Sequence, residues 1–178
     1  QNNLWVPGQL YPFSKHISKF KSLYGSFIDD AIIKLNLDGK IIFKKSVSEI
    51  LLENKKIGEN LLLYRDPIHL NDIEPVLKNN SYMKTGDVFL SSRHLSMIIH
   101  FRPSTNELIN ILTGPFFAPH DVDIISDKEI SIFNNNTFFT IKGEGILTNS
   151  EVVIYNFETK TFSKKFQNGM KKYKVKTK

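Results

Sequence analysis

Three stretches of the sequence share a pattern that is typical of β-hairpins. They are AIIKLNLDGKIIFKKS at 31–46, SMIIHFRPSTNELINILTG at 96–114 and EVVIYNFETKTFSKKF at 151–166. Each consists of two apolar or alternating runs joined by a short turn that is rich in Asp, Gly, Pro, Ser, Thr or Asn. Because a chain of repeated hairpins buries its apolar faces by stacking small sheets, the pattern limits the fold to all-β architectures.

A histidine-containing phrase and a further strand precede each of the last two hairpins. The phrases are DPIHLNDI at 66–73 and GPFFAPHDVDI at 114–124, and the strands lie in GDVFLSSRH and DKEISIFNNN. His69 and His120 stand 51 residues apart. The order of phrase, turn, strand and hairpin therefore occurs twice, and we predict that the two histidines occupy matching positions of the repeat.

A recurring unit of four strands is what a β-propeller blade requires, because each small antiparallel sheet needs neighbours that cover its faces. The hairpin at 31–46 would be the outer half of a preceding blade. We therefore predict an all-β fold: an incomplete β-propeller arc of about three to four blades of antiparallel sheet, with residues 1–178 as a single segment. Since propellers close with about four to eight blades, we expect remaining blades or self-association to complete the fold.

One segment interrupts the strand pattern. Within 46–64, Val47 and Ile50 follow helical spacing, Ser46 is a suitable N-cap, and Glu49 stands three residues after it. The sequence predicts one short helix inserted between blades.

The positive charge of the chain is concentrated near its end. The formal net charge is +6, and the segment 164–178 holds seven lysines and no acidic residue, which leaves −1 for the rest. A lysine-rich end is more often a solvated, frayed tail than a site for polyanions or membrane surfaces. Because the chain has only three arginines, we expect no nucleic-acid partner.

The candidate site follows from the propeller prediction. The first strand of each blade starts near one mouth of the central channel, so matching positions of neighbouring blades converge there. His69 and His120 would face one pocket, with Asn71 and Asp121 beside them. Arg93 follows a strand in this region and could bind an anion through two parallel hydrogen bonds.

Each of these residues also has a structural interpretation. A histidine after proline at the start of a strand is often a turn residue, and Arg93 could pair with a carboxylate of a neighbouring blade. Asp72 and Asp123 would cap turns or tie adjacent blades together, and the three asparagines at 134–136 would form a turn.

Other histidines carry less information. His16, His94 and His100 have no partner phrase, and we interpret them as structural. A metal site from His69, His120 and a carboxylate is conceivable, but the sequence has no close-spaced ligand pair of the kind that marks zinc or calcium sites. We predict no metal and no cofactor.

Three phrases carry a family resemblance: DPIHLNDIEPV, GDVFLSSRHLSMIIHFRPST and GPFFAPHDVDIISDKEISIFNNN. Together they resemble the arylsulfotransferase (ASST-like) family of six-bladed β-propellers, in particular its bacterial branch, over about residues 24 to 165. The resemblance implies an enzyme that transfers a sulfuryl group from an aryl sulfate to a phenol without PAPS or another nucleotide. It also implies an exported, periplasmic or membrane-tethered protein.

The resemblance also implies individual roles. Carried over position by position, it makes His120 the catalytic nucleophile, which forms a sulfohistidine intermediate. Substrate-binding roles fall on His69, Asn71 and Arg93. Pro119 stands next to the nucleophile, where family members commonly carry a polar residue.

Two other functions remain open at this point. The first is a non-catalytic propeller that serves as a binding scaffold for an anionic ligand or a protein partner, which predicts binding of aryl sulfate without turnover. The second is polyanion binding by the lysine-rich end, which predicts a steep dependence on salt.

Overall fold

The computed structural model describes residues 3–14, 17, 27–58, 64–140 and 143–176. Within them lie thirteen strands and two helices of six or more residues. The strands are β1 Leu4–Gln9, β2 Asp30–Leu35, β3 Ile41–Ser46, β4 Leu70–Pro75, β5 Val88–Ser92, β6 Met97–Arg102, β7 Glu107–Leu112, β8 Pro119–Ser126, β9 Glu129–Asn134, β10 Thr137–Thr140, β11 Gly143–Ile146, β12 Glu151–Asn156 and β13 Thr161–Lys165. The helices are α1 Val47–Glu53 and α2 Gln167–Lys172.

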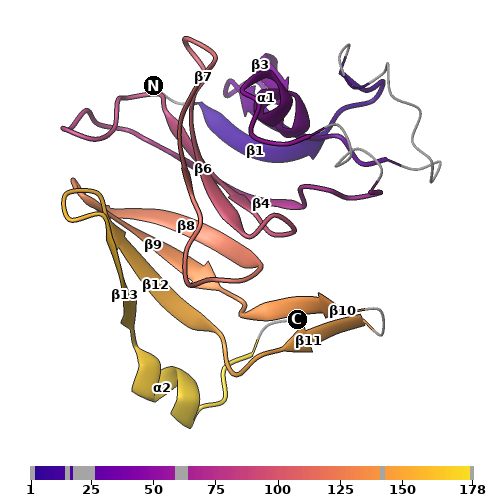
Figure 1. The fold of residues 1–178 in the computed structure, drawn as a ribbon. Coiled ribbons are helices and arrows are strands. Elements are labelled where there is room, and N and C mark those ends of the chain that lie inside the picture. The colour runs from indigo at the N-terminus through magenta and orange to yellow at the C-terminus, as the bar shows by residue number, and fades with distance from the viewer. Residues whose placement is uncertain (1–2, 15–16, 18–26, 59–63, 141–142, 177–178) are drawn as a thin grey trace.

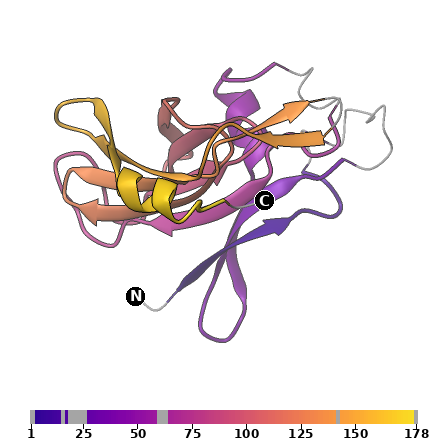
Figure 2. The ribbon, with the colours of Figure 1, turned by 90° about the horizontal axis from the view of Figure 1, so that it is seen from below.

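The strands form three antiparallel sheets and one small hairpin. Their strand orders are β1-β2-β3, β4-β5-β6-β7 and β8-β9-β12-β13. The small hairpin consists of β10 and β11, which lie between β9 and β12 in the chain. Figure 1 shows the three sheets following one another in chain order, and Figure 2 shows the hairpin of β10 and β11 extending away from its four-stranded sheet. The predicted fold class is confirmed: the protein is all-β, an open set of sheets that fits an incomplete propeller arc.

The three hairpins expected from the sequence are confirmed as β2 with β3, β6 with β7, and β12 with β13. In the last two sheets they are the outer pair of strands, and β4 and β8 form the inner edge. In this correspondence β1 is equivalent to β5 and β9, the strands that pair with the inner edge strands β4 and β8. Among the described residues, no strand lies on the inner side of β1.

The second sheet is buried on both faces, which explains why its strands are more uniformly apolar than simple alternation would require. Val88 and Leu90 of β5 belong to a core shared with the first sheet and α1, whereas Phe89 between them belongs to a core shared with the third sheet. Alternate side chains of a strand point to opposite faces, so a strand between two sheets must be apolar throughout. All five residues of β5 are buried.

Helix α1 begins where the sequence predicts. The Ser46 hydroxyl oxygen accepts a hydrogen bond from the Glu49 N–H at 3.1 Å, which satisfies one of the helix's unpaired donors. Val47, Ile50 and Leu51 are buried against the first sheet. The predicted short helix is therefore confirmed, although it ends at Glu53.

Carboxylates tie neighbouring sheets together. Asp72 on β4 accepts a hydrogen bond from the Val122 N–H at 3.2 Å, and Glu74 accepts one from the Ile124 N–H at 3.4 Å. Because β8 is an edge strand, these N–H groups have no partner strand on that side. The predicted tie through Asp72 is confirmed, while the second tie comes from Glu74 and not from Asp123, which accepts a hydrogen bond from Ser131 of its own sheet.

The basic segment after the third sheet contains α2. Its C-terminal residues return to the sheet, where the Ser150 N–H donates to the Val175 carbonyl at 2.9 Å. The helix carries Lys171 and Lys172 in its last turn and has no buried side chain. Among the described residues, no helix is long and apolar enough to cross a membrane.

Candidate functional site

Strand pairing corrects the predicted alignment of the two histidine phrases. Leu70 pairs with Ser92, and Pro119 pairs with Asn134, each at the start of its inner strand. The register then shifts by one residue in both sheets, and Asp72 and Asp121 are the next paired residues.

His120 therefore matches Asn71, since both are the extra residue of a bulge, and His69 matches Ala118. Both members of the second pair have left-handed backbone conformations, with φ of 50° and 51°. The prediction that the two histidines occupy equivalent positions of the repeat is therefore wrong. The sequence spacing was misleading because proline precedes the histidine by one residue in one phrase and by two in the other.

His69 is held in a turn built by Asp66. One carboxylate oxygen of Asp66 accepts the His69 N–H at 3.1 Å, and the other accepts the ring Nδ1–H at 2.6 Å. The carbonyl of His69 in turn accepts the N–H of Arg93 at 3.1 Å. Backbone and ring are both fixed, and the side chain remains 38% exposed.

A second histidine, His94, lies against the first. Its Nδ1–H donates to the Asp66 carbonyl at 2.6 Å, and its ring centroid is 4.6 Å from that of His69 with a tilt of 46°. Its N–H donates to the carbonyl of Ile68 at 3.2 Å, which links the end of the β5 turn to the start of β4. His94 was interpreted as structural from the sequence, because it lacks a partner phrase.

The hydrogen bonds assign one tautomer to each ring. Carbonyl and carboxylate oxygens only accept, so His69 and His94 both carry hydrogen on Nδ1, and Nε2 is the ring nitrogen left to exchange a proton. A ring whose Nδ1–H is held by a carboxylate can use Nε2 as a nucleophile or general base, and the carboxylate stabilises the imidazolium when Nε2 gains a proton. This is the pairing that acid–base catalysis uses.

Asn71 and His120 are brought to the same edge of the two sheets. The Asn71 side-chain Nδ2–H donates to the carbonyl of Pro119, the residue before His120, at 3.3 Å. His120 is exposed, and its side chain has no hydrogen bond to another residue of the described ranges. Arg93 directly follows β5 at this edge, as the sequence indicates.

Two carboxylates near this edge have raised pKa values: Asp30, which is buried, and Asp72, which is partly buried. Burial raises the pKa of Asp30 to about 6, although the Leu70 N–H that it accepts lowers it, and the charge of Asp66 adds to the rise. Burial likewise raises the pKa of Asp72 to about 6, against its hydrogen bond from Val122 and with the neighbouring Asp121 carboxylate adding to the rise.

His100, in contrast, is a core residue, as its structural interpretation requires. It is 1% exposed, stacks on Phe89 with ring centroids 4.3 Å apart, and donates from Nε2 to Asp87 at 3.0 Å. Burial lowers its pKa, although Asp87 opposes the shift. The predicted turn at 134–136 is also present, since Asn136 has a φ of 59°. His16 lies outside the described residues.

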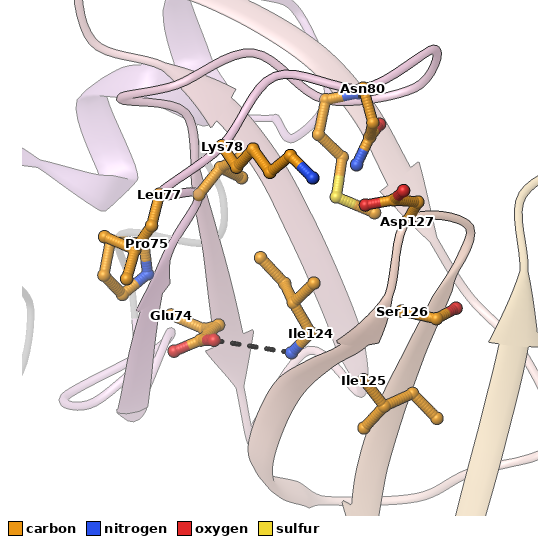
Figure 3. Close-up of a pocket in the computed structure, with 11 residues that line it drawn as sticks. Glu74, Pro75, Leu77, Lys78, Asn80, Ile124, Ile125, Ser126 and Asp127 are labelled. Carbon is orange, nitrogen blue, oxygen red and sulfur yellow. Dashed lines mark hydrogen bonds between the residues drawn. The ribbon is translucent and has the colours of Figure 1, made fainter.

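A pocket of about 300 Å³ lies at the other end of the same two inner strands. Figure 3 shows it between the end of β4, with Glu74 and Leu77, and the end of β8, with Ile125 and Asp127. None of the predicted site residues lines it. The candidate site is the opposite edge, where the two strands begin.

The fold and the candidate site together are an open set of propeller-like sheets with His69, Asn71 and His120 where the inner strands begin and Arg93 directly after β5. A family model described as Arylsulfotransferase (ASST) matches residues 1–178, and the chain belongs to this family. No curated protein matches the chain. Family membership supports an arylsulfotransferase-like function and, at a coarse level, aryl sulfate and phenol as substrates.

Sequence reasoning missed Asp66 and His94. Asp66 stands three residues before His69, a spacing at which a carboxylate can accept the N–H and the ring N–H of the same residue. That signal is local and readable in DPIH. His94 could be found only from the pairing of β4 with β5, which brings two turns together.

Proposed function

We propose that this protein transfers a sulfuryl group from an aryl sulfate to a phenolic acceptor through a sulfohistidine on His120. In the first step a nitrogen of His120 bonds to sulfur, and the bond from sulfur to the aryl oxygen breaks. In the second step the acceptor oxygen bonds to the same sulfur and releases His120. No nucleotide takes part in either step.

His69 is the proposed acid and base. Protonated on Nε2, it would donate that proton to the departing phenolate oxygen, and it would then take the proton of the incoming phenol. The Asp66 carboxylate on Nδ1, at 2.6 Å, stabilises the charged ring between the two steps. Proton and sulfuryl group are thus both returned at the end of the cycle.

Asn71 and Arg93 would bind the sulfuryl oxygens. Negative charge spreads over these oxygens during transfer, and fixed N–H donors stabilise such charge because they need little reorganisation. The Asn71 side chain is anchored to the carbonyl of Pro119, and the backbone of Arg93 is anchored to His69. Remaining blades or a second copy of the chain would close the other side of the site, in accordance with the expectation from the blade count.

The observation that carries the proposal is the hydrogen bond from Asn71 to Pro119. It joins the two inner strands at the positions where His120 and Asn71 occupy matching bulges. This bond supports the proposal because the proposed nucleophile and the proposed oxyanion donor lie on neighbouring strands at one edge. His69, which has a carboxylate partner, directly precedes β4.

The test is incubation with 4-nitrophenyl sulfate and a phenol, followed by release of nitrophenol and intact-mass analysis. We expect a sulfuryl adduct on His120. His120→Asn should abolish the adduct and lower turnover by at least about a thousandfold, as loss of a nucleophile does. Asparagine is chosen because the matching position of β4 already carries one, so the bulge should be retained.

Asp123→Asn is the matched control, because Asp123 is exposed on the same strand and has no proposed role. It should leave turnover within about twofold of the wild-type protein, as surface substitutions usually do. An adduct that persists in His120→Asn would contradict the proposal. Saturable binding of aryl sulfate with no turnover by the folded protein would support the binding-scaffold alternative.

A further inference from the structure

The cluster of Asp66, His69 and His94 has the composition of a metal site. One ligand atom from each residue lies within 4.8 Å of the other two. All three residues are only partly buried, with side-chain exposures of 23%, 38% and 24%. Two imidazoles and one carboxylate form a ligand set that suits zinc and related divalent ions, and three protein ligands leave a coordination position open.

The distances fit one ion between the three side chains. Asp66 Oδ2, the oxygen that accepts the His69 ring hydrogen, lies 2.6 Å from Nδ1 of His69 and 3.8 Å from Nδ1 of His94. Bonds of about 2.0–2.1 Å in a tetrahedral arrangement place two ligand atoms about 3.3 Å apart. The two observed separations lie on either side of this value, so rotations of the side chains are enough to seat the ion.

The backbone around the cluster is already ordered. The other Asp66 oxygen is held by the His69 N–H, and the N–H groups of Arg93 and His94 donate to His69 and Ile68. The hydroxyl of Ser92 donates to the same Ile68 carbonyl at 2.9 Å. A chelating group whose backbone is fixed loses little conformational entropy when the metal binds.

We propose that Asp66, His69 and His94 bind one divalent transition-metal ion, with Zn²⁺ as the best-fitting probe. Asp66 supplies Oδ2, and each histidine supplies Nδ1. The ring hydrogen moves from Nδ1 to Nε2 in both histidines, so neutral imidazoles act as the ligands. Mg²⁺ and Ca²⁺ are excluded by the ligand set, because they take mainly oxygen ligands.

The experiment is titration of the tag-free protein with Zn²⁺ by calorimetry, and with Co²⁺ by visible absorption. We expect one site per chain and the d–d bands of four-coordinate cobalt. His94→Ala and Asp66→Asn should each weaken Zn²⁺ binding by at least about tenfold. Asp66→Asn keeps an oxygen for the His69 N–H, so the turn should persist in that variant.

His120→Asn is the control, because His120 lies on the same edge but outside the cluster. It should bind Zn²⁺ as the wild-type protein does. Absence of a stoichiometric site, equal binding by the wild-type, His94→Ala and Asp66→Asn proteins, or loss of binding in His120→Asn would each overturn the proposal. The readout is metal binding and needs no turnover, so a failure here is distinguishable from a failure of the sulfuryl-transfer proposal. A bound ion would replace the hydrogen bond between His69 Nδ1 and Asp66 Oδ2 that the proposed acid–base role uses.

Discussion

Among the described residues, an aspartate contacts a histidine side chain in two groups, and the surroundings of these groups differ. In the second sheet, Asp87 accepts hydrogen bonds from His100 and from Arg102, at 2.7 Å to Nε of the arginine, and its side chain is 1% exposed. At the start of β4, Asp66 contacts His69 and His94, and all three side chains remain partly exposed.

The difference lies in charge balance and solvent access. Burial alone would raise the pKa of Asp87, but hydrogen bonds from Arg102 and the Lys84 N–H, with His100, overcome it and hold the pKa below its ordinary value. The negative charge of Asp87 is therefore balanced by Arg102 within the fold, and the His100 ring is buried away from solvent. In the group at the start of β4, Asp66 contacts two imidazoles, and all three side chains keep some access to solvent. Similar residues thus make a structural centre in one place and a candidate chemical centre in the other.

The sharpest test of this contrast is removal of the buried carboxylate. Asp87→Ala leaves His100 and Arg102 without their shared acceptor, and breaking a buried pair in this way costs about 3–5 kcal/mol. The free energy of unfolding, measured with urea, should fall by this amount. Asp127→Ala, at an exposed carboxylate, should change it by less than about 0.5 kcal/mol. If Asp87→Ala lowered the free energy of unfolding by as little as Asp127→Ala does, the Asp87 group would not be a structural centre.

The carboxylates between sheets should respond to pH in the opposite sense from Asp87. The pKa of Asp72 is raised from 3.8 to about 6, so between these values the folded protein binds more protons than the unfolded chain. The contribution of Asp72 to stability is therefore fully present below pH 4 and is lost as the pH rises to 6. Asp87, whose pKa is lowered, contributes above its unfolded pKa and loses that contribution in acid.

Asp72→Asn should consequently stabilise the protein at pH 7, by on the order of 1 kcal/mol once solvent screening of this half-buried group is allowed for. The asparagine oxygen can still accept the Val122 N–H. Urea unfolding at pH 4 and at pH 7 measures the effect. A variant that is less stable than the wild-type protein at pH 7 would show that the charged form of Asp72 is needed between the sheets.

The smallest effect on stability is expected at the exposed group. Asp66→Asn keeps an acceptor for the His69 N–H and loses a charge-assisted bond at a partly exposed position, so it should cost less than about 1 kcal/mol. The same substitution should strongly reduce sulfuryl transfer and zinc binding under the proposals above. A large loss of stability, comparable with that of Asp87→Ala, would make Asp66 a structural residue.

Much of the fold could be predicted from local pattern. Alternating runs separated by turn residues predicted the hairpins, and helical spacing after Ser46 predicted α1, because each signal depends on residues close together in the chain. Strand β1 of the first sheet and the hairpin of β10 and β11 were not predicted. The sequence of β1, LWVPGQ, contains proline and glycine, and that of β11, GEGI, contains two glycines, which obscure the strand signal.

The amino-acid sequence by itself determined the strand-rich architecture, the helix cap and the family, since these depend on short-range periodicity and on phrases of a few residues. Tertiary structure decided which residues share an edge: the bulges that align His120 with Asn71, and the turn contact that places His94 on His69. The physical reason is that strand register and sheet packing are set by contacts between residues far apart in the chain. A one-residue shift in register changes which side chains meet without leaving a mark in the local sequence.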